Sequence, residues 1–208
     1  MASSIIHICV AKEINKNLKL DETMLYLGTI APDLSKLCGE TKLKSHFSDN
    51  DDYIPNIDKF IDKYGDNLFD PFIMGYFIHL CTDYLWFRYF ITEFNDYNSI
   101  TLLDGTVMEV DRDQFKKFIY SDYTDMNIKL IDKYELSLDL FFNEVTIPDF
   151  DFNEIDISKL QLLIDECGLI IANTKESKNY VFDITNVSQF IETSSKIIYS
   201  QIDEKEVI

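Results

Sequence analysis

The chain has 208 residues, of which 46% are hydrophobic and 14% aromatic, a composition that excludes an intrinsically disordered protein. Its 19 Lys and Arg residues against 37 Asp and Glu residues give a formal net charge of −18, which repels phosphate backbones and anionic membranes. We therefore expect no nucleic-acid partner. A chain of this length can bury a substantial core, so we expect a single domain over residues 1–208.

Helical spacing of apolar residues predicts two helices near the N-terminus. The first runs from about Ser4 to Lys16. The second lies within "DETMLYLGTIAPDL" and is expected to stop near Gly28, ahead of a turn at Pro32-Asp33. The polar stretch "CGETKLKSHFSDNDDYIP" is predicted to be a surface loop, and a short helix follows it.

A long helix is expected to begin near Asp70-Pro71, because proline fits the first turn of a helix. It continues into the longest apolar segment of the chain, Phe72 to Phe94, which also holds His79 and Asp83. Charged residues inside this segment indicate a buried central helix and argue against a transmembrane segment.

The second half of the chain combines one hairpin with further helices. Asp104-Gly105 lies between β-branched and apolar residues and predicts a small hairpin near residues 100–110. Helical spacing returns over residues 113–134, 157–174 and 186–205, and residues 142–154 are predicted to be a loop. The expected fold class is all-α, a multi-helix domain with a long buried central helix and a small β-hairpin insertion.

Two features of the sequence favour a cytoplasmic protein. The N-terminal stretch has no basic segment ahead of an apolar one, so no signal peptide is predicted. The four cysteines show no C-x-x-C spacing and are expected to be reduced thiols: Cys9, Cys38, Cys81 and Cys167.

The pair His79 and Asp83 poses the main chemical question. Positions four apart share one side of a helix, so both side chains are expected to point the same way in a strongly apolar region. A buried, ionised carboxylate needs a partner or a metal ion. One interpretation is a neutral His79 that is hydrogen-bonded to Asp83 within the core.

The other interpretation is a metal site. All three histidines of the chain, His7, His46 and His79, fall within its first two-fifths. Together with Asp33 and Asp83 they offer five ligands of the kinds that zinc prefers. Simpler roles are open for three of them: His7 as a satisfied core histidine, His46 as a surface residue, and Asp33 as a cap of its turn.

Four motifs occur in the same order, with similar spacing, as in a known family: "SSIIHICVAKEI", "LGTIAPD", "SHF" and "GYFIHLCTDYLW". Over roughly its first 95 residues the chain resembles the zinc-dependent phospholipase C family, whose superfamily includes single-strand-specific nucleases. The resemblance implies that His7, Asp33, His46, His79 and Asp83 bind zinc. It further implies that Asp83 bridges two zinc ions and that Asp33 acts as the base that steers the attacking water.

The chain also departs from this family. Secreted members begin with a tryptophan that binds metal, and they carry a third metal site with two more histidines and a glutamate; here the chain begins Met1-Ala2-Ser3, and no histidine follows His79. Asp122 and Asp125 are the candidates for a third site in their place, although their spacing does not indicate one. We expect a site for two zinc-type ions.

The expected function is metal-dependent hydrolysis of a phosphate ester, most simply a small or lipid-derived phosphodiester. A phosphomonoesterase or another metallohydrolase is the alternative within the same chemistry. A metal-stabilised binding or structural module without catalysis is the alternative from another class. The HD-domain phosphohydrolases are disfavoured, because the sequence contains no His-Asp dipeptide.

Overall fold

The computed structural model describes residues 2–39, 41–49, 54–96, 98–148, 150 and 152–206. It is 68% helical with one small antiparallel sheet, so the predicted all-α fold class is confirmed. None of the described helices is long and apolar enough to cross a membrane. The helices are α1 (Ser4–Leu18), α2 (Glu22–Ile30), α3 (Leu34–Leu37), α4 (Lys42–Ser45), α5 (Ile57–Tyr64), α6 (Pro71–Leu85), α7 (Arg112–Lys133), α8 (Asp139–Phe142), α9 (Leu160–Ala172) and α10 (Ile184–Glu206).

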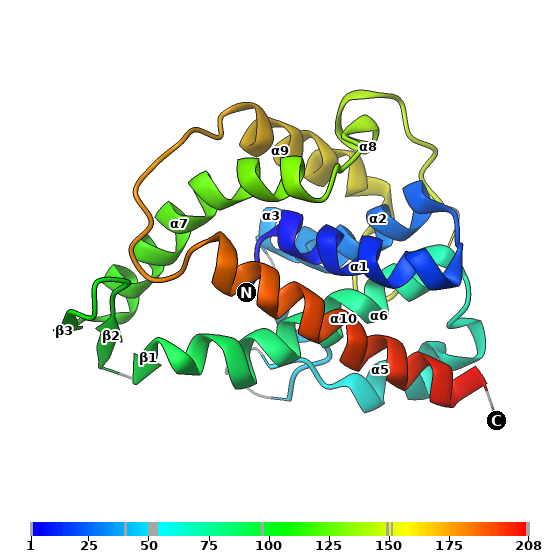
Figure 1. The fold of residues 1–208 in the computed structure, drawn as a ribbon. Helices are drawn as coiled ribbons and strands as arrows, with labels where there is room; N and C mark the ends of the chain where they lie inside the picture. The colour runs from blue at the N-terminus through cyan, green and yellow to red at the C-terminus, as the bar shows by residue number, and fades with distance from the viewer. Residues whose placement is uncertain are drawn as a thin grey trace.

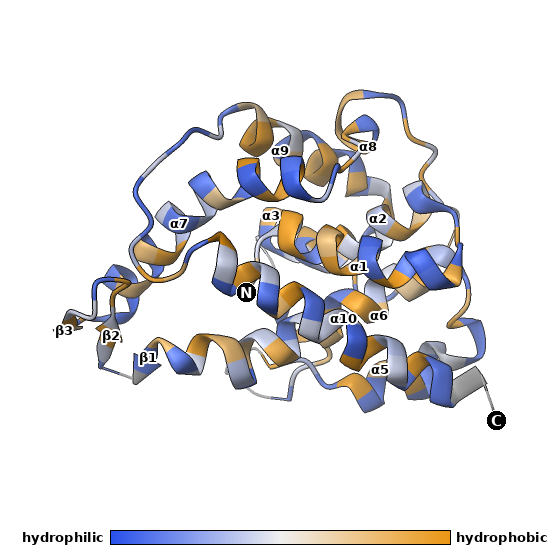
Figure 2. Cartoon of the chain, viewed as in Figure 1, coloured by the Kyte–Doolittle hydropathy of each residue, from blue (hydrophilic) through white to orange (hydrophobic). Residues whose placement is uncertain are grey.

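Helix α1 occupies the middle of the molecule, where it contacts α2, α6, α7 and α10 (Figure 1). Apolar residues of α1 and α10 alternate with polar ones along each helix (Figure 2), as expected for helices that turn one side to a core. Helix α6 is buried at every position except Pro71 and Tyr84, so the predicted central helix is confirmed. It continues into a π-helical turn, Trp86–Phe90, and a 3-10 turn, Ile91–Glu93.

The crossing of α2 and α6 corrects one prediction. Gly28 does not end its helix: α2 runs on to Ile30 and into a 3-10 turn, Ala31–Asp33. A Cβ atom on Gly28 would lie 2.0 Å from the carbonyl oxygen of Phe72, and one on Gly75 would lie 2.1 Å from that of Leu25. Both glycines therefore serve the close approach of two backbones, which brings the end of α2 against the middle of α6.

In the stretch predicted as a surface loop, residues 38–55, the described residues are partly buried and partly helical, and residues 40 and 50–53 lie outside the description. It holds α4, whose residues Lys42 and Ser45 are buried together with the following His46. The hydroxyl of Tyr76 donates a hydrogen bond of 2.6 Å to the carbonyl of Ser45, which ties α4 to the central helix. The polar composition of this stretch suggested a surface loop. Its polar side chains Lys42, Ser45 and His46 instead lie inside the protein, where they contact other polar groups.

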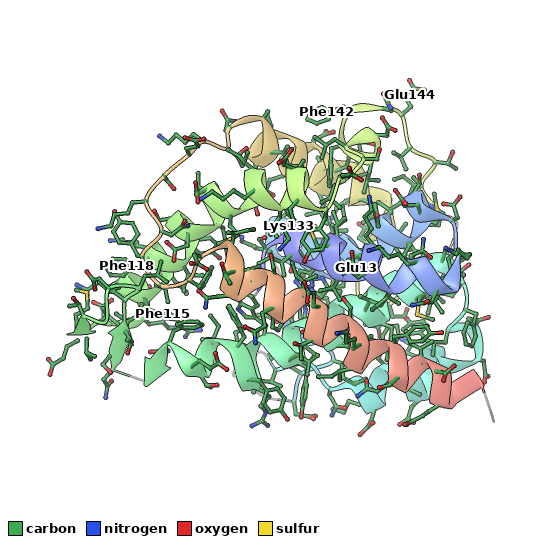
Figure 3. All side chains as sticks on the ribbon, viewed as in Figure 1. Glu13, Phe115, Phe118, Lys133, Phe142 and Glu144 are labelled. Atoms are coloured by element: carbon green, nitrogen blue, oxygen red, sulfur yellow. The ribbon has the colours of Figure 1, made fainter. Side chains whose placement is uncertain are left out.

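The sheet is slightly larger than predicted. The expected hairpin is formed by β2 (Ser99–Thr101) and β3 (Val107–Glu109), and the turn between them contains Gly105 at φ +82°. A further strand, β1 (Asn95–Asp96), pairs with β2, so strand is not confined to residues 100–110. The first turns of α7, which carry Phe115 and Phe118, lie near this sheet (Figure 3).

Helices α7, α9 and α10 begin and end within three residues of their predicted bounds, whereas the short helix α8 was not predicted. In the predicted loop of residues 142–154, the described residues beyond Phe142 form no helix or strand, and residues 149 and 151 lie outside the description. Phe142, at the end of α8, is 59% exposed on the outside of the molecule (Figure 3). Phe152 instead stacks on Tyr76 with ring centroids 5.4 Å apart, so this loop packs against the central helix.

Candidate metal centre

The five residues predicted as metal ligands come together in one place. His7 lies on α1, Asp33 ends the 3-10 turn after α2, His46 follows α4, and His79 and Asp83 lie on α6. The three histidines and Asp83 are at most 1% exposed, whereas the side chain of Asp33 is 15% exposed. The cluster is therefore closed on most sides and reaches the surface through Asp33.

Asp83 lies between the histidines. Its Oδ1 is 3.3 Å from Nε2 of His7 and accepts a hydrogen bond of 3.1 Å from the backbone N–H of Ala2. Its Oδ2 lies 3.4 Å from Nε2 of His46 and 3.7 Å from Nε2 of His79. The two oxygens of one carboxylate thus face two different sets of imidazole nitrogens.

His46 and His79 point the same ring atom at each other, with their Nε2 atoms 3.2 Å apart. Two nitrogens bound to one tetrahedral zinc at about 2.0–2.1 Å lie about 3.3 Å apart, so the pair fits a shared ion. Nδ1 of His79 donates to the carbonyl of Thr29 at 2.8 Å, which leaves the Nε2 lone pair of a neutral His79 ring facing the cluster. Nδ1 of His46 lies 3.0 Å from the hydroxyl of Ser45, which orients that ring in the same way.

Asp33 completes this side of the cluster. Its Oδ1 lies 3.8 Å from Nε2 of His79 and 4.0 Å from Nε2 of His46. The ammonium group of Lys42 also contacts Oδ1 of Asp33. Two carboxylates and one ammonium leave one negative charge unbalanced among these groups when the imidazoles are neutral, so the cluster attracts a cation.

Burial and neighbouring charges set the protonation states. Burial lowers the pKa of His46, and it lowers that of His79 well below its usual value. Burial alone would raise the pKa of Asp83, but the imidazoles of His7 and His46 outweigh it and hold the pKa well below the usual range. Burial alone would also raise the pKa of Asp33. The nearby positive groups, led by the ammonium of Lys42, outweigh burial and lower this pKa. Neutral imidazoles and ionised carboxylates are the forms that bind metal.

Three buried polar atoms of the cluster have no hydrogen-bond partner: Nδ1 and Nε2 of His7 and Oδ2 of Asp83. Leaving a buried polar group without a partner costs about 1–3 kcal/mol of stability. Such groups are therefore rare in proteins unless they bind an ion or water or have a catalytic role. Two overlapping sets of potential ligands stand within 4.8 Å of one another: His7, His79 and Asp83, and Asp33, His46 and His79. These groups of donor atoms could therefore hold a metal ion.

The simpler roles suggested by the sequence do not fit this geometry. The ring of His7 stacks on His79 at 3.9 Å, and neither of its nitrogens is hydrogen-bonded, so it is not a satisfied core histidine. His46 is fully buried, which excludes a surface loop residue. The side chain of Asp33 makes no capping hydrogen bond at the start of α3.

Asp122 and Asp125 do not join the cluster as a third site. Both oxygens of Asp122 accept hydrogen bonds from the backbone N–H groups of residues 180–182, at 2.7, 2.7 and 3.2 Å. Asp125 contacts the ammonium of Lys129 at 2.5 Å and accepts a hydrogen bond from the N–H of Ser177. These carboxylates attach the segment before α10 to α7, and neither belongs to the ligand sets found among the described residues.

Three groups at the site were not anticipated from the sequence: the Lys42 ammonium, the Thr29 carbonyl and the Ala2 N–H. A weak signal exists for Lys42, which precedes His46 by four residues in "TKLKSH". The two backbone groups carry no signal, because their roles depend on how α1 and α2 pack against α6.

Comparison with known proteins adds no assignment, since no family model, no curated protein and no solved structure matches this chain. The case for the site therefore depends on its own geometry.

Proposed function

We propose that this protein is a metal-dependent hydrolase of phosphate esters that uses zinc at the five-residue cluster. The observation that carries the proposal is the meeting of three imidazoles and two carboxylates in one buried place, where three polar atoms lack any hydrogen-bond partner. The resemblance of the first 95 residues to zinc-dependent phospholipase C points to the same chemistry.

In this proposal two ions share the cluster. Asp33, His46 and His79 would hold one and His7 the other, with Asp83 between them, in keeping with the directions that its oxygens face. Paired zinc ions lower the pKa of a bound water and neutralise charge on the attacking and leaving oxygens of a phosphate ester.

Asp33 is proposed to orient the attacking water. It is the most exposed of the five, and it lines a cavity that reaches the cluster. Its carboxylate stays ionised beside Lys42, so it accepts a hydrogen bond from water at neutral pH. Because the low pKa makes it a weak base, its main contribution is the position of the water.

The favoured substrate is a small or lipid-derived phosphodiester. The net charge of −18 disfavours long polyanions such as nucleic acids, whereas a single phosphate group would meet the positive ions at the site. A reducing compartment such as the cytoplasm fits the four cysteines, all of which are free thiols.

The test combines metal analysis with an assay. Zinc content is measured on the purified protein, and hydrolysis of bis(4-nitrophenyl) phosphate is followed before and after chelation. Asp33→Asn should lower kcat about 100-fold, whereas Asp132→Asn, an exposed carboxylate on α7, should leave it unchanged.

Two results would redirect the proposal. If zinc-replete protein turns over no phosphodiester, phosphomonoester or phospholipid, the hydrolase is wrong. If chelation then still lowers the melting temperature, the chain is the metal-stabilised binding or structural module instead.

A further inference from the structure

A cavity of about 400 Å³ opens beside the metal cluster, between the start of α1, α3, α7 and α9. Asp33, one of the proposed ligands, and Ala2, whose N–H is bonded to Asp83, line it. Its volume falls within the range of small-molecule sites. A ligand in this cavity would therefore lie directly against the cluster.

One side of the cavity is polar and carries a positive charge. Lys36 follows Asp33 by three residues, and its ammonium lies 5.8 Å from the ring centroid of Tyr120 on α7. Of the described residues that line the cavity, Lys36 is the only cation and Asp33 the only carboxylate. Asp33 already contacts the ammonium of Lys42. A cationic ligand in the cavity would therefore find no lining carboxylate without a positive partner.

The other side of the cavity is apolar. Ile5 from α1 and Cys167 and Ile171 from α9 are at most 9% exposed, and Ile170 at the rim is 49% exposed. Burial raises the pKa of Cys167, so this thiol stays neutral and behaves as an apolar group. The wall thus suits a hydrocarbon or aromatic group.

We propose that this cavity binds the organic substituent of the phosphate ester, and that it selects a neutral, apolar substituent over a cationic one. The proposal rests on the proposed function for the presence of the phosphate. The phosphate lies between the cluster and Lys36, whose ammonium pairs with a phosphate oxygen. The substituent packs against Ile5, Ile170 and Ile171, and a quaternary ammonium group there is repelled by Lys36.

Phosphonates test this binding without turnover, because their carbon–phosphorus bond replaces the ester bond. Calorimetry compares two of them on the zinc-loaded protein: phenylphosphonate and 2-(trimethylammonio)ethylphosphonate. Phenylphosphonate should bind more tightly by about three- to tenfold, the range that one exposed charge, Lys36, and one apolar wall supply. Lys36→Glu should abolish or invert this preference, and Ile170→Asp should weaken only phenylphosphonate.

Lys196→Glu is the matched control, because it makes the same charge change on the exposed face of α10 and should leave the preference unaltered. Circular dichroism of each variant checks that the helices are retained. Equal affinities of the wild type for both phosphonates, no binding of either, or an unchanged ratio in Lys36→Glu would each overturn the proposal.

The result also separates this proposal from the proposed hydrolysis. Selective phosphonate binding without turnover of any ester would keep the cavity as a ligand site and reject the enzyme. Turnover of esters with no effect of Lys36→Glu or Ile170→Asp on either phosphonate would keep the enzyme and reject the cavity.

Discussion

Two buried carboxylates, Asp83 on α6 and Asp122 on α7, show opposite ways of keeping a carboxylate inside this protein. Asp122 accepts three backbone hydrogen bonds from residues 180–182 and has no unpartnered oxygen. Asp83 accepts one backbone hydrogen bond, faces three imidazoles and keeps Oδ2 unpartnered. Both side chains have the same exposure, 0%.

Burial of a carboxylate therefore does not identify a metal site. The partners decide: backbone N–H groups satisfy the charge and attach a segment, whereas imidazole nitrogens that lack hydrogen bonds need a further positive group. We interpret Asp122 as structural and Asp83 as the central ligand.

The largest expected effect follows from Asp83→Asn. The substitution keeps the shape of the side chain but removes the charge, and an amide nitrogen replaces one of the two oxygens that face the imidazoles. Zinc affinity, measured by competition with a chelating dye, should fall more than about 100-fold, beyond the usual loss for an outer partner of a ligand. Retention of wild-type affinity would remove Asp83 from the ligand set.

Asp122→Asn should give the reverse result. The amide group turns an NH₂ toward backbone N–H groups that had bonded a carboxylate, so the free energy of unfolding should drop by about 3 kcal/mol. Zinc affinity of the folded protein should stay within about twofold, because the hydrogen bonds of Asp122 go to backbone N–H groups of residues 180–182 and not to the five ligands. Urea titration reports the first quantity and dye competition the second. Loss of zinc from a folded Asp122→Asn protein would undo the contrast between the two carboxylates.

Gly75→Ala should connect packing to the site. The added methyl group would meet the carbonyl oxygen of Leu25 at 2.1 Å, so α2 and α6 must separate, at a cost of about 2 kcal/mol. Separation also shifts the Thr29 carbonyl that orients His79, so zinc affinity should fall as well. Gly65→Ala is the control, because its methyl group would meet only a side-chain atom of Ile61 at 3.3 Å. Equal stability of the two variants would show that the close crossing is not required.

The smallest effect is a dependence of metal-free stability on pH. His46 and His79 have lowered pKa values in the folded protein, so the unfolded chain binds more protons below about pH 6.5 and stability falls as the pH drops through that value. Asp33 and Asp83, also lowered, add a further loss below about pH 4. The raised pKa of Asp122, caused by burial, acts in the opposite direction.

Melting temperatures of the metal-free protein between pH 8 and pH 5 measure the histidine contribution. His79→Asn should reduce the slope, since one of the two depressed imidazoles is gone. A melting temperature that stays constant over this range in the wild type would show that these rings do not titrate as described.

The sequence was informative where a pattern is local. The i,i+4 pair His79 and Asp83 and the Asp104-Gly105 turn each follow from neighbours in the chain, and the structure has them as expected. Gly28 was misread as a helix stop because its reason is a contact with Phe72, which no local pattern records.

The same distinction explains the site. Its five side chains could be proposed, because histidine is scarce in this chain and the motifs resemble a known family. The burial of His46 and the ammonium of Lys42 at Asp33 could not, since both arise from the packing of a polar stretch against α6. Asp122 and Asp125 were candidates for a third site in sequence, and their partners, backbone N–H groups and the ammonium of Lys129, separate them from the ligands.

The most direct test of the central claim is the zinc K-edge X-ray absorption spectrum of the zinc-loaded protein. The account predicts nitrogen and oxygen ligands at about 2.0–2.1 Å, with the scattering pattern of coordinated imidazole and no sulfur. A zinc–sulfur distance of about 2.3 Å would place the metal on the cysteines and contradict the cluster of His7, Asp33, His46, His79 and Asp83.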